Sequence, residues 1–266
     1  MSFMKKVRKR AGKTGSLLCI GLDPDPALVP DPFGNTPSDL FDFLSHVIQA
    51  TESYAAAFKP NMAYFEALGV EGIQLLERVL KVIPEDLPVI ADAKRGDVGH
   101  SSKHYAGSLF SHFGFDAATV SPYLGQDSLE AFLEYPEHGV FVLCLTSNSG
   151  ARDFQLPELH LKVARRVREW NRYGNSGLVV GATHPENIAA IRKVSGPMPY
   201  LIPGIGAQGG ELETTLKAAE DGTEVPCLIN ASRSILYPAQ AGDSIASSRN
   251  AAIELHGRIR SLLEFN

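Results

Sequence analysis

Short apolar segments alternate along the chain with longer segments in which hydrophobic residues recur at helical spacing. The short segments are rich in β-branched residues, and most are apolar throughout rather than at every second position. Continuous apolarity is typical of parallel strands that are covered on both faces. The predicted strands are 17–22, 56–59, 89–93, 117–121, 140–145, 178–180, 200–202 and 227–229.

Helices are predicted between these strands. The segments with helical periodicity are 38–56, 64–82, 101–113, 126–135, 157–173, 185–194, 211–221 and about 245–265. About eight strand–helix units fill the chain, close to the size of a (β/α)8 barrel of about 250 residues. We therefore predict an α/β fold, a single-domain (β/α)8 TIM barrel over residues 1–266, with a basic amphipathic helix over about residues 1–15.

An open doubly wound sheet is the alternative architecture. It would normally carry a Gly-x-Gly-x-x-Gly turn after its first strand. Residues 21–26 instead read Gly-Leu-Asp-Pro-Asp-Pro. No Pro/Gly/Ser-rich linker divides the chain, so one barrel domain is favoured.

Composition limits the class of partner. The formal charge of −5 provides no basic field for nucleic acid, and no apolar run approaches the roughly 20 residues of a membrane helix. Cys19, Cys144 and Cys227 each lie in an apolar run, as expected for buried thiols in a reducing compartment. We expect a cytoplasmic protein with a small-molecule partner rather than a nucleic acid or a membrane.

Charged side chains stand where predicted strands end, which is the catalytic face of such a barrel. Asp92 and Lys94 are two residues apart and should project to the same side of their strand, while Lys59 ends the preceding strand. Asp92 is therefore predicted to lie between two ammonium groups. Buried ion pairs stabilise weakly, so this cluster indicates a site more than a structural salt bridge.

A glycine-rich loop and an arginine suggest phosphate binding. Residues 203–210 read Pro-Gly-Ile-Gly-Ala-Gln-Gly-Gly, and backbone N–H groups of such a loop can approach an anion. Arg233, after the eighth strand, offers a bidentate fork. In barrels, phosphates commonly bind in the loops after strands seven and eight.

Signals for metal or cofactor chemistry are missing from the sequence. The eight histidines show no shared metal-ligand spacing, and no Cys/His cluster suggests zinc. A Gly-x-Ser-x-Gly nucleophile elbow is also absent. We therefore predict no metal and no cofactor.

Four segments together resemble the orotidine 5′-phosphate decarboxylase family, especially its longer bacterial subgroup. They are Phe-Lys-Pro-Asn at 58–61, Asp-Ala-Lys-Arg-Gly-Asp at 92–97, Pro-Gly-Ile-Gly-Ala-Gln-Gly at 203–209 and Asn-Ala-Ser-Arg-Ser at 230–234. The resemblance implies a lyase of pyrimidine biosynthesis that converts orotidine 5′-phosphate to uridine 5′-phosphate and CO2. This is the last step of de novo UMP synthesis.

The resemblance also implies roles for individual residues. Lys59, Asp92 and Lys94 would form a charged array, and Lys94 would stabilise and protonate a carbanion at C6. Asp97 would complete the array in the active site of a partner subunit, accompanied by Val98 and Ser101, so a homodimer is expected. The expected substrate contacts are Asp23 and Lys59 at the ribose, Ser147 at the pyrimidine, and Gln208 with its neighbouring backbone and Arg233 at the phosphate. Gly206 and Ser232 are further expected substrate-binding residues.

Two positions depart from the family pattern. Ser101 stands where Thr is usual, which keeps the hydroxyl, and Ser149 stands where many relatives have Pro, which removes backbone stiffness beside the base. Two other functions share parts of the pattern. One is a magnesium-dependent phosphosugar aldolase or decarboxylase, which would need a carboxylate where the chain has Lys59. The other is a non-catalytic phosphate-binding barrel, which would have no use for Lys94.

Overall fold

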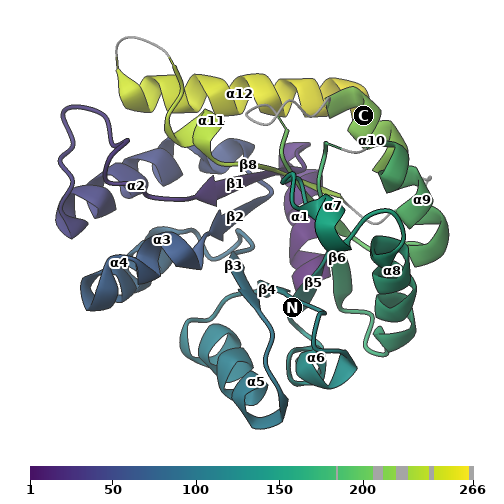
Figure 1. Cartoon of the computed structure of the whole chain (residues 1–266). Coiled ribbons are helices and arrows are strands. Elements are labelled where there is room, and N and C mark those ends of the chain that lie inside the picture. The colour runs from purple at the N-terminus through teal and green to yellow at the C-terminus, as the bar shows by residue number, and fades with distance from the viewer. Residues whose placement is uncertain (184, 206–211, 220–226, 240–242, 264–266) are drawn as a thin grey trace.

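Eight parallel strands form one sheet that curls into a barrel (Figure 1). The computed structural model describes residues 1–183, 185–205, 212–219, 227–239 and 243–263. The sheet order is β2-β1-β8-β7-β6-β5-β4-β3, and bridges from Phe58 to Val89 and from Asn61 to Asp92 bring its two edges together. The strands are β1 (Leu18–Leu22), β2 (Ala57–Pro60), β3 (Ile90–Arg95), β4 (Ala117–Val120), β5 (Gly139–Leu145), β6 (Ser176–Val180), β7 (Tyr200–Pro203) and β8 (Leu228–Ala231).

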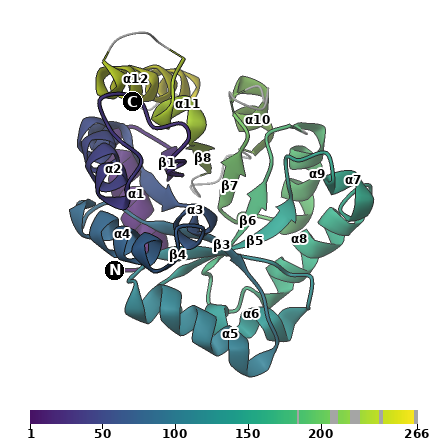
Figure 2. The same cartoon turned by 60° about the vertical axis from the view of Figure 1, so that its left-hand side comes forward.

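Helices surround the strands (Figure 2). They are α1 (Phe3–Thr14), α2 (Pro37–Thr51), η1 (Glu52–Tyr54), α3 (Met62–Glu66), α4 (Gly69–Val82), α5 (Gly99–Ala106), the π-helical η2 (Gly107–His112), α6 (Gln126–Leu133), α7 (Ala151–Phe154), α8 (Leu159–Trp170), α9 (Pro185–Ser195), α10 (Leu212–Ala219), α11 (Arg233–Leu236) and α12 (Ser244–Leu263). The predicted (β/α)8 barrel is thus confirmed, and the open doubly wound sheet is rejected.

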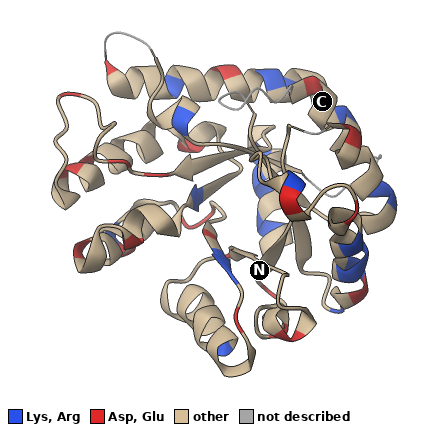
Figure 3. Ribbon diagram, viewed as in Figure 1, with Lys and Arg blue, Asp and Glu red and all other residues tan. Residues whose placement is uncertain are grey.

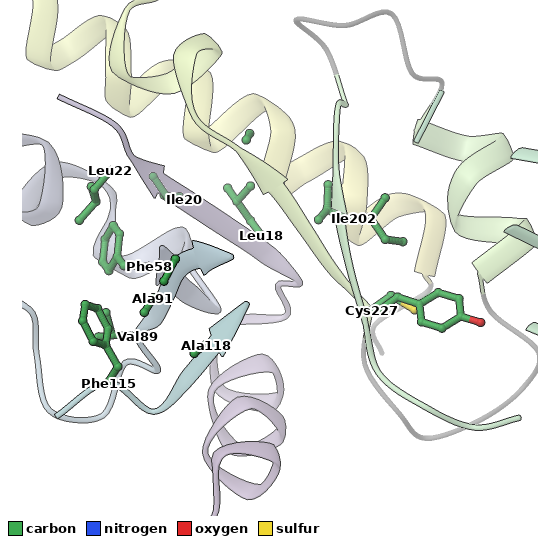
Figure 4. Packing of buried hydrophobic residues seen from close by; sticks show 14 of the residues in the cluster. Leu18, Ile20, Leu22, Phe58, Val89, Ala91, Phe115, Ala118, Ile202 and Cys227 are labelled. Carbon is green, nitrogen blue, oxygen red and sulfur yellow. The ribbon is translucent and has the colours of Figure 1, made fainter. Parts of the chain in front are cut away.

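The outer layer of the core lies between the strands and the surrounding helices. Figure 4 shows Leu18, Ile20 and Leu22 of β1 in this layer, near Phe58 of the neighbouring strand. All four side chains are fully buried. Continuous apolarity along β1 is therefore explained by burial on both faces of the sheet.

The amino-terminal helix closes one end of the barrel. Phe3 and Val7 of α1 pack into a second apolar cluster with residues at the amino-terminal ends of the strands. The ring of Phe3 meets that of Phe141 edge-on, with centroids 5.7 Å apart. Gly139 makes this approach possible, because a Cβ at that position would lie 2.4 Å from the Phe3 ring.

Several helix boundaries differ from the predicted ones. The segment 38–56 forms α2, which ends at Thr51, and η1, and the segment 101–113 forms α5 and the π-helical η2. The segment 64–82 is predicted as one helix but forms α3 and α4, which are separated by Ala67 and Leu68; α4 then begins at Gly69, where φ is 65°. A positive φ is incompatible with continuing a right-handed helix. The short helices α7 and α11 were not predicted, because four-residue helices are too short to establish a periodicity. None of the helices in the described ranges has the length and apolar character required to cross a membrane.

Candidate active site

A mostly buried carboxylate lies between two ammonium groups at the carboxyl-terminal end of the barrel. Lys59 Nζ in β2 is 2.6 Å from Asp92 Oδ2, and Lys94 Nζ is 2.5 Å from Asp92 Oδ1. Lys59 is 3% exposed, whereas the Lys94 side chain is half exposed. In Figure 3, both basic (blue) and acidic (red) positions are present on β2 and β3. Asp92 thus lies between two ammonium groups, as the sequence predicts, although the strand is not regular at Lys94.

The backbone at Lys94 is strained. Its φ is 49°, which is the left-handed region, and Lys94 is the non-glycine residue with positive φ in the described part of the chain. The register of β3 against β4 also shifts between Ala91 and Arg95. Strain of this kind persists where surrounding contacts hold it, and it is concentrated at functional sites. Lys94 therefore reaches Asp92 from an irregular strand and not from a simple alternating one.

Asp92 and Lys59 hold each other in the charged form. Burial alone would raise the pKa of Asp92, but the adjacent Lys59 and Lys94 outweigh burial and hold that pKa well below its usual range. Burial would likewise lower the pKa of Lys59, yet Asp92 and Asp23 raise it to about 12. These directions favour a carboxylate and an ammonium at neutral pH.

A cavity of about 390 Å³ extends from this array across the barrel mouth. Residues from several strand ends contribute to it, and the polar ones are Asp23, Lys59, Tyr64, Asp92, Asn230, Ser232, Arg233 and Ser234. The structure thus brings five of the predicted site residues together. Lys94 joins them through its contact with Asp92.

Asp23 follows β1 at the edge of this cavity. Burial raises the pKa of its carboxyl, although Lys59 and Ser232 act in the opposite direction. Its Oδ1 is buried and has no hydrogen-bond partner within the described residues. Tyr237 fixes the segment, since its Oη donates to the Asp23 carbonyl at 3.1 Å and accepts from the Asp25 N–H at 2.8 Å. An unsatisfied carboxylate oxygen at a cavity wall suits a ligand hydroxyl.

The predicted phosphate-binding residues are only partly described. Ser232 and Arg233 line the cavity at the start of α11. Gly206 and Gln208 lie outside the described residues. Their expected contacts therefore stay predictions.

Four other predicted site residues do not line this cavity: Asp97, Val98, Ser101 and Ser147. Asp97 follows β3, where the Val98 N–H donates to its Oδ1 at 2.7 Å. Val98 and Ser101 are exposed at the start of α5. Ser147 follows β5, and its carbonyl accepts a hydrogen bond from Thr183 at 3.5 Å. Exposure of the Asp97 region is what a contact with a second subunit would require.

Three further polar residues belong to this region and were missed from the sequence. Thr119 in β4 donates to Asp92 Oδ1 at 3.0 Å, while Tyr64 and Asn230 line the cavity. Asn230 Oδ1 is buried and lacks a hydrogen-bond partner within the described ranges. Thr119 could have been identified from the sequence because it is the one hydroxyl residue in the apolar strand β4, which follows the strand that carries Asp92 and Lys94. In those same ranges, no three His, Cys, Asp or Glu side chains form a metal-binding group.

Comparisons with known proteins point to one family. Residues 16–247 match the model of the Orotidine 5′-phosphate decarboxylase / HUMPS family. The chain is 43% identical over 270 residues to the orotidine 5′-phosphate decarboxylase of Roseiflexus castenholzii, covering 99% of each. It is 44% identical over 263 residues to that of Cupriavidus taiwanensis, covering 96% of each. The structure of the Leishmania donovani OMP decarboxylase superimposes with a TM-score of 0.88 at 40% identity, covering 98% of this chain and 99% of that one.

Proposed function

The chain belongs to the Orotidine 5′-phosphate decarboxylase / HUMPS family, and we propose that this enzyme converts orotidine 5′-phosphate to uridine 5′-phosphate and CO2 without a cofactor. The reaction would be the last step of UMP synthesis. The observation that carries the proposal is the Lys59–Asp92–Lys94 array, in which Lys59 is buried and Asp92 is mostly buried, at a cavity with Arg233 in its wall.

In the proposed reaction the bond between C6 and the carboxylate breaks. CO2 leaves and the electron pair stays on C6, where no ring orbital delocalises it. The Lys94 ammonium stabilises this negative charge and then transfers a proton to C6. The neutral amine regains its proton from solvent. A preorganised cation at the atom that becomes negative is an effective form of electrostatic catalysis.

Asp92 is proposed to aim the ammonium of Lys94 and to stay ionised. Its low pKa, which Lys59 and Lys94 maintain against burial, keeps it from taking the proton that C6 requires. A unit-charge pair at 4 Å contributes about 4 kcal/mol at an effective dielectric of 20. Enzymes typically lower barriers by roughly 8–23 kcal/mol, so one pair is not sufficient.

Binding of the remote phosphate is proposed to supply much of the remainder. Arg233 and the loop around Gln208 would grip the phosphate and align the ring over Lys94. Binding energy gained far from the reacting atoms can be used to orient and desolvate them. The cavity shared by Asp92 and Arg233 supports this link between the two ends of the substrate.

We further propose that two copies of the chain share each active site through Asp97. The proposal predicts complementation between inactive variants. Lys94→Ala and Asp97→Ala should each be inactive alone. Random reassociation of equal amounts would put one intact site in half of the dimers, about a quarter of wild-type activity. Mixtures that stay inactive after confirmed subunit exchange would refute the shared site.

The direct test of function is incubation with orotidine 5′-phosphate in EDTA. We expect the ultraviolet absorbance of the orotate ring to change as its carboxylate leaves, with CO2 released in equal amount. Activity that EDTA abolishes would favour a metal-dependent enzyme of the same barrel type. Tight nucleotide binding without any CO2 release would favour a binding protein.

A further inference from the structure

Strands β3 and β4 are out of step beside the charged array. Ala91 pairs with Ala118, whereas Arg95 pairs with Val120, so one β4 residue, Thr119, stands opposite three residues of β3. Extra residues of this kind form a β-bulge, which disrupts the ladder of backbone hydrogen bonds and redirects side chains. The donors that the bulge releases need other acceptors.

The hydroxyl of Thr119 fills this gap in the ladder. Its Oγ1 accepts a hydrogen bond from the Lys94 N–H at 3.0 Å and donates one to Asp92 Oδ1 at 3.0 Å. The Thr119 side chain is 1% exposed, so water cannot easily replace either bond. A hydroxyl can accept and donate at once, and a β-branched residue suits the strand.

Both partners of Thr119 are parts of the proposed catalytic machinery. One is the peptide of Lys94, whose φ of 49° is unfavourable for a side chain of this kind. The other is the carboxylate oxygen that holds the Lys94 ammonium at 2.5 Å. A single hydroxyl therefore fixes the backbone of Lys94 and the acid that orients its tip.

We propose that Thr119 is the positioning residue that places the Lys94 ammonium against the reacting carbon. This inference rests on the proposed function, because it assigns Thr119 a part in that reaction. Thr119 acts through Lys94 and Asp92 and has no role in holding substrate. Valine at this position would keep the shape but remove both hydrogen bonds, whereas serine would keep the hydroxyl.

The test compares Thr119→Val and Thr119→Ser in the full-length protein. We expect Thr119→Val to lower kcat for orotidine 5′-phosphate by about 10²-fold, the scale of a 1 Å misplacement. KM should change little, because phosphate and ribose contacts stay intact. Thr119→Ser should recover most of kcat. Thr51→Val is the matched control, since Thr51 is also buried but its hydroxyl donates to Val47 of α2 at 2.7 Å.

A second readout separates positioning from simple loss of structure. Amide hydrogen exchange at Lys94 should be at least about tenfold faster in Thr119→Val than in wild type and nearly unchanged in Thr119→Ser. If Thr119→Val does not fold, Thr119→Ala removes the same hydroxyl with less bulk. Wild-type kcat in the folded valine or alanine variant, or a serine variant as slow as valine, would overturn the proposal.

Failure of this inference and failure of the proposed function give different results. A wild-type protein that does not decarboxylate orotidine 5′-phosphate would refute the function. Exchange at Lys94 would then still decide whether Thr119 holds this backbone. Unchanged exchange in both hydroxyl-less variants would refute the positioning role.

Discussion

The two ends of the barrel differ in chemistry: apolar packing dominates at the amino-terminal end, and charged side chains are gathered at the carboxyl-terminal end. At the amino-terminal end, α1 places Phe3 against Phe141, and Lys6 pairs with Asp116 at 2.8 Å near the rim. At the carboxyl-terminal end, buried charges and a left-handed lysine surround a cavity. One end satisfies ordinary packing rules, and the other departs from them.

This contrast separates stability from function within one sheet. Apolar contacts at the amino-terminal end lower the free energy of the folded state, and they lie away from the ligand cavity. The charges at the other end are costly to desolvate, and Asp92 would be strongly destabilising without its two lysines. Substitutions at the first end should therefore change stability, and substitutions at the second should change turnover.

Lys94→Ala is expected to have the largest effect. If Lys94 is the proton donor and stabilising cation as proposed, its loss should lower kcat by at least about 10³-fold. The melting temperature should change little, because the Lys94 side chain is half exposed and Asp92 keeps Lys59 and Thr119. Steady-state kinetics with thermal unfolding measures both, and Lys103→Ala on α5 is the control. A variant that keeps a tenth of wild-type kcat would contradict the assignment of turnover to the carboxyl-terminal end of the barrel.

Phe3→Ala should lower stability and leave kcat nearly unchanged, the reverse of what is expected for Lys94→Ala. Removing a ring that is 2% exposed at the barrel end should lower the free energy of unfolding by about 3–5 kcal/mol. The kcat of the folded fraction should stay near wild type. Urea unfolding at fixed protein concentration measures the first quantity. Phe154→Ala, at a ring that is 71% exposed, should change neither, and a large loss of kcat in Phe3→Ala would contradict the separation.

The same contrast explains what the sequence could predict. Strands such as β5 (Gly139–Leu145) were predicted almost to the residue, because burial on both faces leaves a continuous apolar run. The Asp92–Lys94 pair was predicted from strand alternation. The left-handed φ of Lys94 was not, since it depends on Thr119 in a neighbouring strand. Tertiary contacts set this conformation, and no local pattern encodes them.

Arg233→Ala tests how far the phosphate end serves the chemistry at the other end of the cavity. We expect kcat/KM for orotidine 5′-phosphate to fall by about 10²-fold, the loss of a charge-assisted bidentate contact. Orotidine, which lacks the phosphate, should be turned over equally by variant and wild type. Arg258→Ala on α12 is the control. Equal losses on both substrates would show that Arg233 does not act through the phosphate.

A pair of matched carboxylate substitutions gives the smallest and most selective test. Asp116 near the amino-terminal end is paired with Lys6 and accepts the Val89 N–H at 2.8 Å. Asp23 at the cavity has a buried Oδ1 without a partner in the described residues. Asp116→Asn should therefore destabilise the protein by about 1 kcal/mol, whereas Asp23→Asn should stabilise it by a similar amount while lowering activity.

The pH dependence of the Asp23→Asn effect identifies its cause. Burial raises the pKa of Asp23 above its ordinary value of 3.8, so the folded state binds this proton more tightly than the unfolded chain does. The wild type consequently loses stability as pH rises from that ordinary value through the higher folded value, and asparagine does not. The stability gained by Asp23→Asn should thus be small in acid, grow across this interval and then stay constant to neutral pH.

Thermal unfolding of both proteins from pH 3 to 8 measures the difference. A gain that is independent of pH would assign the effect to altered packing, and a loss at neutral pH would show that the Asp23 carboxylate stabilises the cavity.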